Sequence, residues 1–206
     1  MAEEKKKLII EIFRKKEPEE LTAALADPAG KLDIGSAAAL CAADGCAMAL
    51  RAARITAASV ESERVEYIVR NLDKLRSYFV YLIDEDVKGR NIMKRALKEG
   101  DEQKVEAARQ PAAAISDEVI CQAINVIDLL DELAQLAPAA CATYLGSAAE
   151  LLLAGIRSAR LAVLQLAAGS SDETYRYIVR RENEIRLDEL REKTARLRAF
   201  AEEHLG

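Results

Sequence analysis

A long alanine-rich stretch, residues 35–50, constrains the fold of this chain more than any other feature. It opens with Gly35-Ser36 and continues with Ala, Gly and Cys among only a few larger side chains. Alanine has the highest helix propensity of all residues, so the stretch predicts a helix. Such a surface of small side chains lets a second helix, or a ligand at the first turn, approach the backbone closely.

Composition favours an all-α protein. Of the 206 residues, 50% are hydrophobic but only 4% are aromatic, which is typical of helices packed through small side chains. The length suits one sizeable core, so we expect a single domain over residues 1–206, with residues 1–17 as a loosely attached N-terminal segment. The net charge of -5 and the lack of an obvious basic face argue against binding to nucleic acid.

No segment has the pattern of a membrane span or a secretory signal. The best apolar segment, residues 151–166, is interrupted by Arg157 and Arg160, whereas a span needs roughly 20 consecutive apolar residues. Near the N-terminus only three apolar residues follow the lysines before Glu11, too few for a signal peptide. We therefore expect no membrane association and a cytoplasmic location.

Cysteine and histidine usage argues against several kinds of site. The four cysteines form no Cys-x-x-Cys pair and lie in alanine-rich contexts, so we interpret them as small buried hydrophobic residues. The single histidine, His204, lies near the C-terminus. Its isolation argues against a zinc site, a di-iron site built from Glu-x-x-His pairs, and a histidine-activated nucleophile. We expect no bound metal.

Hydrophobic periodicity and breaker residues predict a bundle of long antiparallel helices. The expected segments are 18–26, 36–59, 61–98, 112–136, 142–168 and 173–204, with Pro111 read as a helix boundary and Ser36 as the N-cap of the second helix. The two Ala/Gly-rich helices, 36–59 and 142–168, should form the centre. Glycine inside a helix costs about 1 kcal/mol relative to alanine, so Gly45, Gly146 and Gly155 indicate close backbone approach. We expect part of this small-residue surface to lie at a subunit interface, which favours a dimer.

Three segments resemble one enzyme family in both order and spacing. They are Glu19-Glu20-Leu21-Thr22-Ala23-Ala24-Leu25-Ala26 followed by Gly35-Ser36-Ala37-Ala38-Ala39-Leu40, then Leu82-Ile83-Asp84-Glu85-Asp86-Val87-Lys88-Gly89-Arg90-Asn91, then Thr143-Tyr144-Leu145-Gly146-Ser147-Ala148-Ala149. Together they resemble the cyclodeaminase/cyclohydrolase family over roughly residues 18–204. That family includes the cyclodeaminase domain of formiminotransferase-cyclodeaminase and the stand-alone methenyltetrahydrofolate cyclohydrolases.

The resemblance implies an all-α homodimer that acts on a tetrahydrofolate derivative, without a metal. One implied reaction is hydrolysis of 5,10-methenyltetrahydrofolate to 10-formyltetrahydrofolate, and the other is cyclodeamination of 5-formiminotetrahydrofolate. The alternative is a diverged, non-catalytic helical dimer of the same fold that binds another ligand or a protein partner. Three departures favour that alternative: the family's glycine-rich loop reads Leu32-Asp33-Ile34-Gly35-Ser36 here, Arg90 replaces an aromatic residue, and Tyr144 replaces an aspartate.

Asp84 and Asp86 are the candidate catalytic residues. They lie about 200° apart on a helix, so they cannot share one face. Partial burial would raise the pKa of either carboxyl and suit it to proton transfer. The competing interpretation is a solvated acidic turn.

The candidate substrate-binding residues are Gly35, Ser36, Arg90, Tyr144 and Arg157. Ser36 either donates to a ligand or only caps its helix. Arg157, with Arg160, either binds a carboxylate such as a folate glutamate tail or forms a salt bridge with a neighbouring helix. Tyr144 lies near Gly146, where it would close or fill a pocket.

Overall fold

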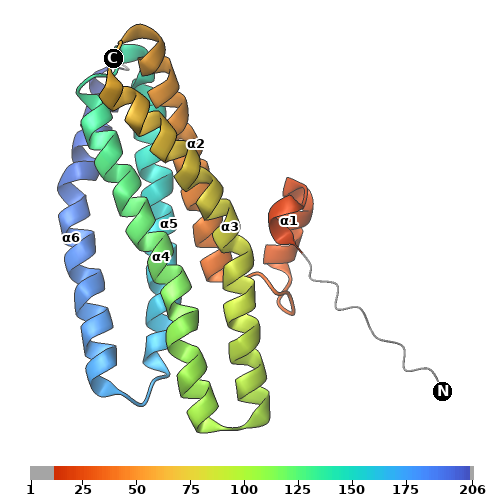
Figure 1. The fold of residues 1–206 in the computed structure, drawn as a ribbon. Helices are drawn as coiled ribbons and strands as arrows, with labels where there is room; N and C mark the ends of the chain where they lie inside the picture. The colour runs from red at the N-terminus through yellow and green to blue at the C-terminus, as the bar shows by residue number, and fades with distance from the viewer. Residues whose placement is uncertain (1–11, 205–206) are drawn as a thin grey trace.

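The computed structural model describes residues 12–204, and this part of the chain folds into helices without strands (Figure 1). The all-α prediction is confirmed. In chain order the elements are η1 (Phe13–Lys15), α1 (Pro18–Ala26), α2 (Ile34–Ser59), α3 (Glu63–Glu99), α4 (Glu102–Ala134), η2 (Ala139–Cys141), α5 (Ala142–Ala168) and α6 (Glu173–Glu203).

The two small-residue helices, α2 and α5, pack against each other in antiparallel directions. A Cβ added to Gly155 of α5 would lie 3.0 Å from the carbonyl oxygen of Ala38 and 3.1 Å from the backbone nitrogen of Ala42, both on α2. Gly45 of α2 lies equally close to Leu152. The close approach predicted from the helical glycines is therefore confirmed at these positions.

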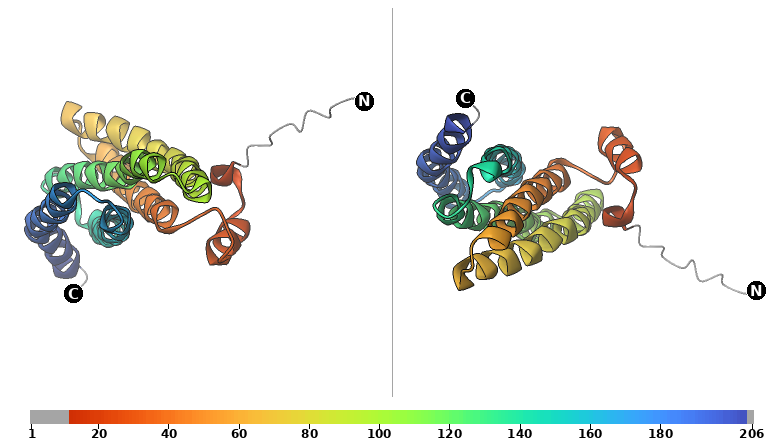
Figure 2. Two further views of the ribbon diagram at one scale, coloured as in Figure 1. Left: turned by 90° about the horizontal axis from the view of Figure 1, so that it is seen from below. Right: turned by 90° about the horizontal axis from the view of Figure 1, so that it is seen from above.

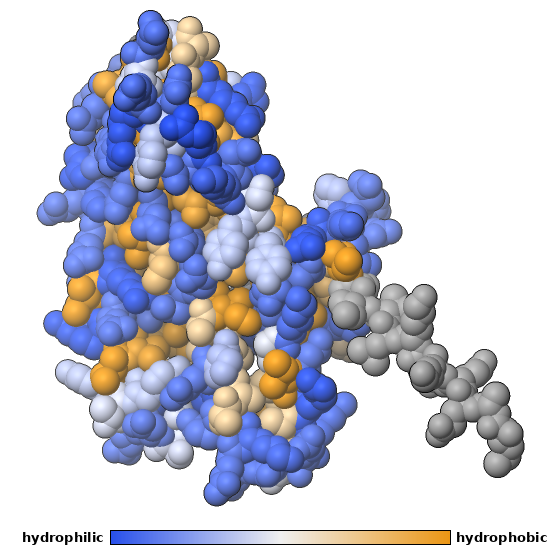
Figure 3. All heavy atoms as spheres, in the orientation of Figure 1, coloured by the Kyte–Doolittle hydropathy of each residue, from blue (hydrophilic) through white to orange (hydrophobic). Residues whose placement is uncertain are grey.

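Longer and more polar helices cover this pair. Helices α3 and α4 pack against α2 and α5, and α6 packs along α5 and α4 (Figures 1 and 2). The face in Figure 3 is mostly hydrophilic with scattered hydrophobic residues. On this polar side α6 is joined to α4 by three ion pairs: Arg186 with Asp117, Lys193 with Asp128, and Arg196 with Asp131.

The ends of the long helices follow local chemistry. Gly100 has φ 70°, the left-handed conformation that glycine adopts at little cost, and it ends α3. The Asp101 side chain then accepts from the backbone N–H of Lys104 at 3.1 Å and caps α4. Asp172 caps α6 in the same way through Tyr175. The predicted breaks at residues 99–101 and 169–171 are thus confirmed.

Two helix boundaries differ from the sequence expectation. Asp33, rather than Ser36, caps α2, because its carboxylate accepts from the Ile34 N–H at 2.8 Å while the Ser36 hydroxyl bonds elsewhere. Pro111 lies inside α4 instead of starting a new helix. Its position on the exposed side of the helix leaves its ring in solvent, so the lost hydrogen bond does not break the packing.

The N-terminal part packs against one side of the bundle. Residues 1–11 of the expected N-terminal segment lie outside the described residues, and nothing is concluded about them. Helix α1 lies to the side of the bundle, level with the middle of α3 (Figures 1 and 2). Phe13 of η1, in contrast, is buried in the core, with 3% of its surface exposed.

By length and composition alone, α2 and the segment Ala139–Ala168 are apolar enough to cross a membrane. Both are core helices of this bundle, and core helices commonly pass the same test. This weak similarity does not indicate a membrane protein.

We expect Gly155→Val to lower the free energy of unfolding by about 1–3 kcal/mol, because the new side chain would meet backbone atoms of α2 that cannot rotate away. Urea unfolding followed by circular dichroism measures the change. Ala114→Val, at an exposed position of α4, is the control and should cost less than about 1 kcal/mol. Equal unfolding midpoints for the two variants would contradict the close contact.

Candidate functional site

A buried carboxylate lies where the first turn of α2 meets α3. Asp86 of α3 is 2% exposed. The Ser36 hydroxyl donates to its Oδ2 at 2.7 Å, and Arg90 Nε donates to its Oδ1 at 3.5 Å. Any side chain at Gly35 would overlap Asp86 Oδ1, so the backbone of α2 rests directly on the carboxylate. The structure thus brings Gly35, Ser36, Asp86 and Arg90 together.

Burial sets the proton affinity of this carboxylate. Loss of solvent raises the pKa of Asp86 above the usual range of aspartate, and this outweighs the lowering by Arg90 and by the Ser36 hydrogen bond. A carboxyl group that holds its proton more strongly than an exposed aspartate is a better candidate for accepting and returning a proton.

Asp33 and Arg90 close this site from the side of the loop. One carboxylate oxygen of Asp33 caps α2 through the Ile34 N–H, and the other forms an ion pair with Arg90 Nη1. The Arg90 side chain is 12% exposed, and its buried Nη2 has no hydrogen-bond partner among residues 12–204. Arg90 therefore contacts two carboxylates and retains unused donor capacity.

Ser116 is a site residue that the sequence analysis missed. It lies on α4 with 1% exposure, and its hydroxyl has no hydrogen-bond partner in the described part of the chain. A Cβ added to Gly35 would lie 2.9 Å from Ser116 Oγ, so this hydroxyl lies beside the same turn of α2. A buried hydroxyl without a partner is unfavourable by about 1–3 kcal/mol, which a polar ligand would offset. A single serine inside a predicted helix carries no sequence signal that could have found it.

Asp84 binds the N-terminal segment and takes no part in the Asp86 cluster. Its Oδ1 accepts from the backbone N–H groups of Phe13 at 2.8 Å and Arg14 at 3.3 Å, and Arg14 Nε lies 3.4 Å from its Oδ2. The two aspartates lie on different sides of α3, as their spacing predicts. Asp84 attaches the N-terminal segment to α3 and is covered by it.

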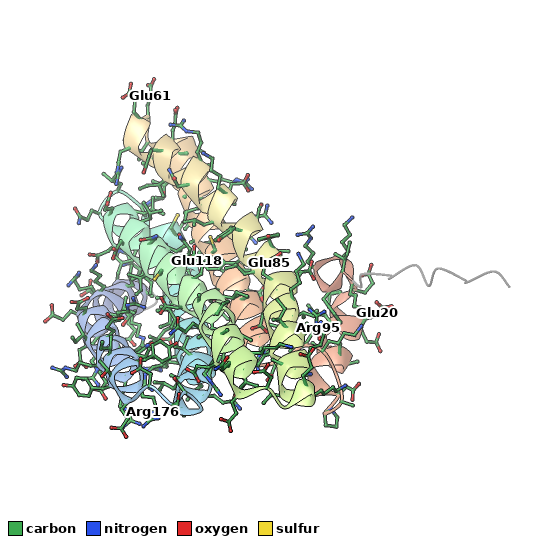
Figure 4. All side chains as sticks on the ribbon, turned by 60° about the horizontal axis from the view of Figure 1, so that its bottom comes forward. Glu20, Glu61, Glu85, Arg95, Glu118 and Arg176 are labelled. Carbon is green, nitrogen blue, oxygen red and sulfur yellow. The ribbon has the colours of Figure 1, made fainter. Side chains whose placement is uncertain are left out.

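Glu85, between these aspartates, is bonded at the outer surface. Its carboxylate accepts from Lys88 Nζ at 2.6 Å. Burial raises its pKa, but hydrogen bonds from Lys88 and Tyr81 outweigh this and lower it. Figure 4 shows Glu85 on α3 and Glu118 on α4. Tyr78 interacts with both of these carboxylates.

Two further candidates lie apart from the Asp86 cluster. Tyr144 packs under the guanidinium of Arg51, whose carbon lies 4.7 Å from the ring centre. Arg51 follows Ser36 by 15 positions on α2, which corresponds to about 22 Å along a helix. Arg157 is exposed, two residues after Gly155, and it has no ion-pair or hydrogen-bond partner among the described residues.

Possible metal ligands and surface hollows do not mark the Asp86 cluster. Among residues 12–204, no group of three or more His, Cys, Asp or Glu side chains is placed to hold a metal ion. Three surface hollows lie on the outer side of the α3 start, at the turn between α3 and α4, and between α5 and α6. None of them is lined by Asp86.

We expect Asp84→Asn to loosen the N-terminal segment, because it weakens the bonds to Phe13 and Arg14. Limited trypsin digestion should then cleave after residues 14–16 several times faster than in the wild type. Glu85→Gln, one residue along and without a hydrogen bond to Phe13 or Arg14, is the control. Equal cleavage rates in the two variants would show that Asp84 does not hold the segment.

The raised pKa of Asp86 predicts a specific pH dependence of stability. Between the usual aspartate pKa of about 3.9 and the raised value, the folded state retains a proton that the unfolded state has lost. The contribution of Asp86 is therefore greatest below pH about 3.9 and is lost as the pH rises through the raised pKa.

The test compares the wild type with Asp86→Asn, which does not titrate, by urea unfolding at a series of pH values. The free energy of unfolding of the wild type relative to the variant should fall over this window and then become constant. A relative stability that rises with pH would contradict the raised pKa.

Comparison with known proteins identifies the family of this chain and its fold. The family model described as formiminotransferase-cyclodeaminase matches residues 18–184. Among solved structures, the crystal structure of formiminotetrahydrofolate cyclodeaminase from Thermotoga maritima superimposes with a TM-score of 0.85 at 21% sequence identity, covering 93% of this chain and 98% of that chain. At this identity the likeness shows the shared fold. No curated protein matches the sequence significantly. Because the family model spans most of the sequence, the chain belongs to the formiminotransferase-cyclodeaminase family.

Proposed function

We propose that the chain is a folate enzyme that hydrolyses 5,10-methenyltetrahydrofolate to 10-formyltetrahydrofolate, with cyclodeamination of 5-formiminotetrahydrofolate as the related alternative. Family membership supports the substrate class. The observation that carries the proposal is the buried Asp86, whose pKa is raised and which lies beside the hydroxyls of Ser36 and Ser116.

In this proposal Asp86 moves the proton in both halves of the reaction. A water molecule adds to the cationic methenyl carbon, a C–O bond forms, and the Asp86 carboxylate takes the proton that water releases. The carbinolamine then loses its hydroxyl proton to solvent as the carbon–N5 bond breaks. Asp86 returns its proton to N5, and the net reaction consumes one water and releases one proton.

The other residues of the cluster position the reactants. Ser36 holds Oδ2 of Asp86. Arg90 Nε and the Gly35 backbone lie against Oδ1, so in this proposal Arg90 has to move before Oδ1 can meet the reacting atoms. The Ser116 hydroxyl and Arg90 Nη2, both buried and without a hydrogen-bond partner in the described chain, offer donors to the polar atoms of the ligand. When the substrate is already electrophilic, holding the reacting groups close together and correctly oriented accounts for much of the rate acceleration.

The anionic glutamate tail of a folate would pair with an arginine. Arg90 lies in the cluster and would exchange its Asp33 contact for a ligand carboxylate. Arg157, exposed and unpaired among the described residues, is the second candidate and lies outside the cluster. The proposal includes a tetrahydrofolate derivative as the small-molecule partner, a homodimer, and a cytoplasmic location.

A second candidate is a non-catalytic helical dimer that binds another ligand or a protein partner. One observation favours it: Asp33, where the family's loop is rich in glycine, pairs with Arg90 and closes the site while Gly35 rests on Asp86. The two candidates differ in whether folate is turned over.

We expect the purified chain to accelerate loss of the methenyltetrahydrofolate absorbance over buffer, and Asp86→Asn to reduce the rate by about 10²–10⁴-fold, the range for loss of an acid/base group. Glu85→Gln is the matched control and should retain the wild-type rate, since its carboxylate is bonded at the outer surface. Asp84→Asn separates the two aspartates and should affect the rate far less than Asp86→Asn.

A wild-type rate equal to buffer would exclude the cyclohydrolase activity, and ammonia release from 5-formiminotetrahydrofolate would then test the cyclodeaminase activity. A thermal shift with folates but without either turnover would identify a binding protein. If neither activity nor a thermal shift with folates is observed, the second candidate remains, and its ligand is not a folate.

A further inference from the structure

We infer that the hollow between α5 and α6 binds a small aromatic phosphate of the nucleoside monophosphate class. The hollow has a volume of about 420 Å³, within the range of roughly 300–1,000 Å³ that small-molecule sites occupy. It is lined by Leu164, Ala167 and Ala168 of α5 and by Arg176, Tyr177 and Arg180 of α6, and Figure 4 shows Arg176 near the start of α6. None of these residues belongs to the Asp86 cluster, so the inference does not depend on the proposed folate chemistry.

The charged groups that line the hollow are all guanidinium groups. Arg180 has no ion-pair or hydrogen-bond partner among residues 12–204. It is the exception on its helix, because each of the other arginines of α6 pairs with a carboxylate; these are Arg176, Arg181, Arg186, Arg191, Arg196 and Arg198. Arg180 is therefore a cation that an anion from solution can pair with.

Two arginines of α5 extend the positive charge along the seam between α5 and α6. Glu150 of α5 pairs with Arg198 of α6, so it marks the face of α5 that meets α6. Arg157 and Leu164 follow Glu150 at seven-residue steps, which keeps them on that face, and Arg160 lies between them. In the described part of the chain neither arginine has a partner, and Arg160 Nε is buried. A buried donor without an acceptor is unfavourable, and an anion over the seam would supply the acceptor.

The negative groups beside the hollow are already bonded or screened. The Leu166 carbonyl at the end of α5 accepts from Arg109 Nη1 at 3.1 Å. The Glu106 carboxylate accepts from the Ser170 hydroxyl in the turn between the helices. The side chain of Glu173 is 89% exposed, so water screens its charge. The hollow therefore remains favourable for an anion.

The uncharged lining favours an anion with a flat, apolar body. Tyr177 is 70% exposed, and its ring contacts no other ring or cation among the described residues. Leu164 and Ala167 supply an apolar floor. Nucleobases stack on aromatic side chains, and a guanidinium group binds phosphate through two N–H donors at once. A nucleoside monophosphate combines both parts, and its charge of roughly -2 matches the unpaired Arg160 and Arg180.

Isothermal titration calorimetry of the full chain with adenosine 5′-monophosphate tests the inference. We expect saturable binding with a Kd of about 1 mM or tighter. Arg180→Gln should weaken it about tenfold or more, the effect of losing hydrogen bonds to a charged group. Because Arg180 is exposed and unpaired, this variant should stay folded. Arg181→Gln, next to it, outside the hollow and paired with Glu184, is the matched control and should bind like the wild type.

A second pair of variants tests the aromatic part of the site. Tyr177→Ala should weaken binding of the nucleotide about fivefold or more, the effect of losing a stacked base. Ile178→Ala, at the adjacent exposed position, is its control. Inorganic phosphate alone and adenosine alone should each bind about tenfold more weakly than the nucleotide, because each makes only one of the two contacts.

Asp86→Asn shows whether the nucleotide binds in the hollow or in the Asp86 cluster, and it should bind like the wild type. The inference is overturned by the absence of saturable binding up to about 1 mM, by equal affinities for phosphate and nucleotide, or by binding that depends on Asp86 and not on Arg180. Turnover of methenyltetrahydrofolate is measured separately and bears on the proposed function alone.

Discussion

The backbone contact between α2 and α5 is the constraint on which the rest of the structure depends. Gly155 lies against the Ala38 carbonyl and the Ala42 nitrogen, so the helices approach through atoms that cannot rotate away. Such contact requires small side chains where the two helices touch. The larger apolar side chains of the core come from α3, α4 and α6 and from other positions of α5, such as Leu145 and Ile156. The contact also fixes the direction in which the first turn of α2 meets α3.

That fixed turn explains how a carboxylate is kept in the core. Asp86 is covered by the Gly35 backbone, where any side chain would overlap it, and it is stabilised by one hydroxyl and one guanidinium. Arg90 in turn is held by Asp33, which also caps α2. A buried carboxylate with so few partners is costly. It persists because helix cap, ion pair and packing contact are made by the same few residues.

The sequence predicted the helices and the central pair because periodicity and small-residue content are local signals. The predictions that failed depend on contacts between residues far apart in the sequence. Ser36 and Asp33 are both good N-caps, and only the fold shows that Ser36 bonds a residue 50 positions away. Pro111 is a breaker by its chemistry, but its exposed position inside α4 is set by packing.

The spacing of Asp84 and Asp86 predicted opposite sides, while the segment that covers Asp84 has no such pattern. Ser116 was missed because one serine in a helix carries no signal by itself.

In the proposed function, the ion pair between Asp33 and Arg90 would link the loop before α2 to ligand binding. Arg90 cannot reach a ligand carboxylate with Nη1 while Asp33 occupies it, and Asp33 cannot leave without uncapping Ile34. A ligand must therefore supply at least the free energy of one partly buried ion pair and of one N-cap, the latter about 1 kcal/mol. The buried donors without partners, Ser116 Oγ and Arg90 Nη2, are the groups on this chain that would recover that cost. Substrate selectivity would then depend on whether a ligand satisfies both donors, since a ligand that meets only one leaves the other unpaired.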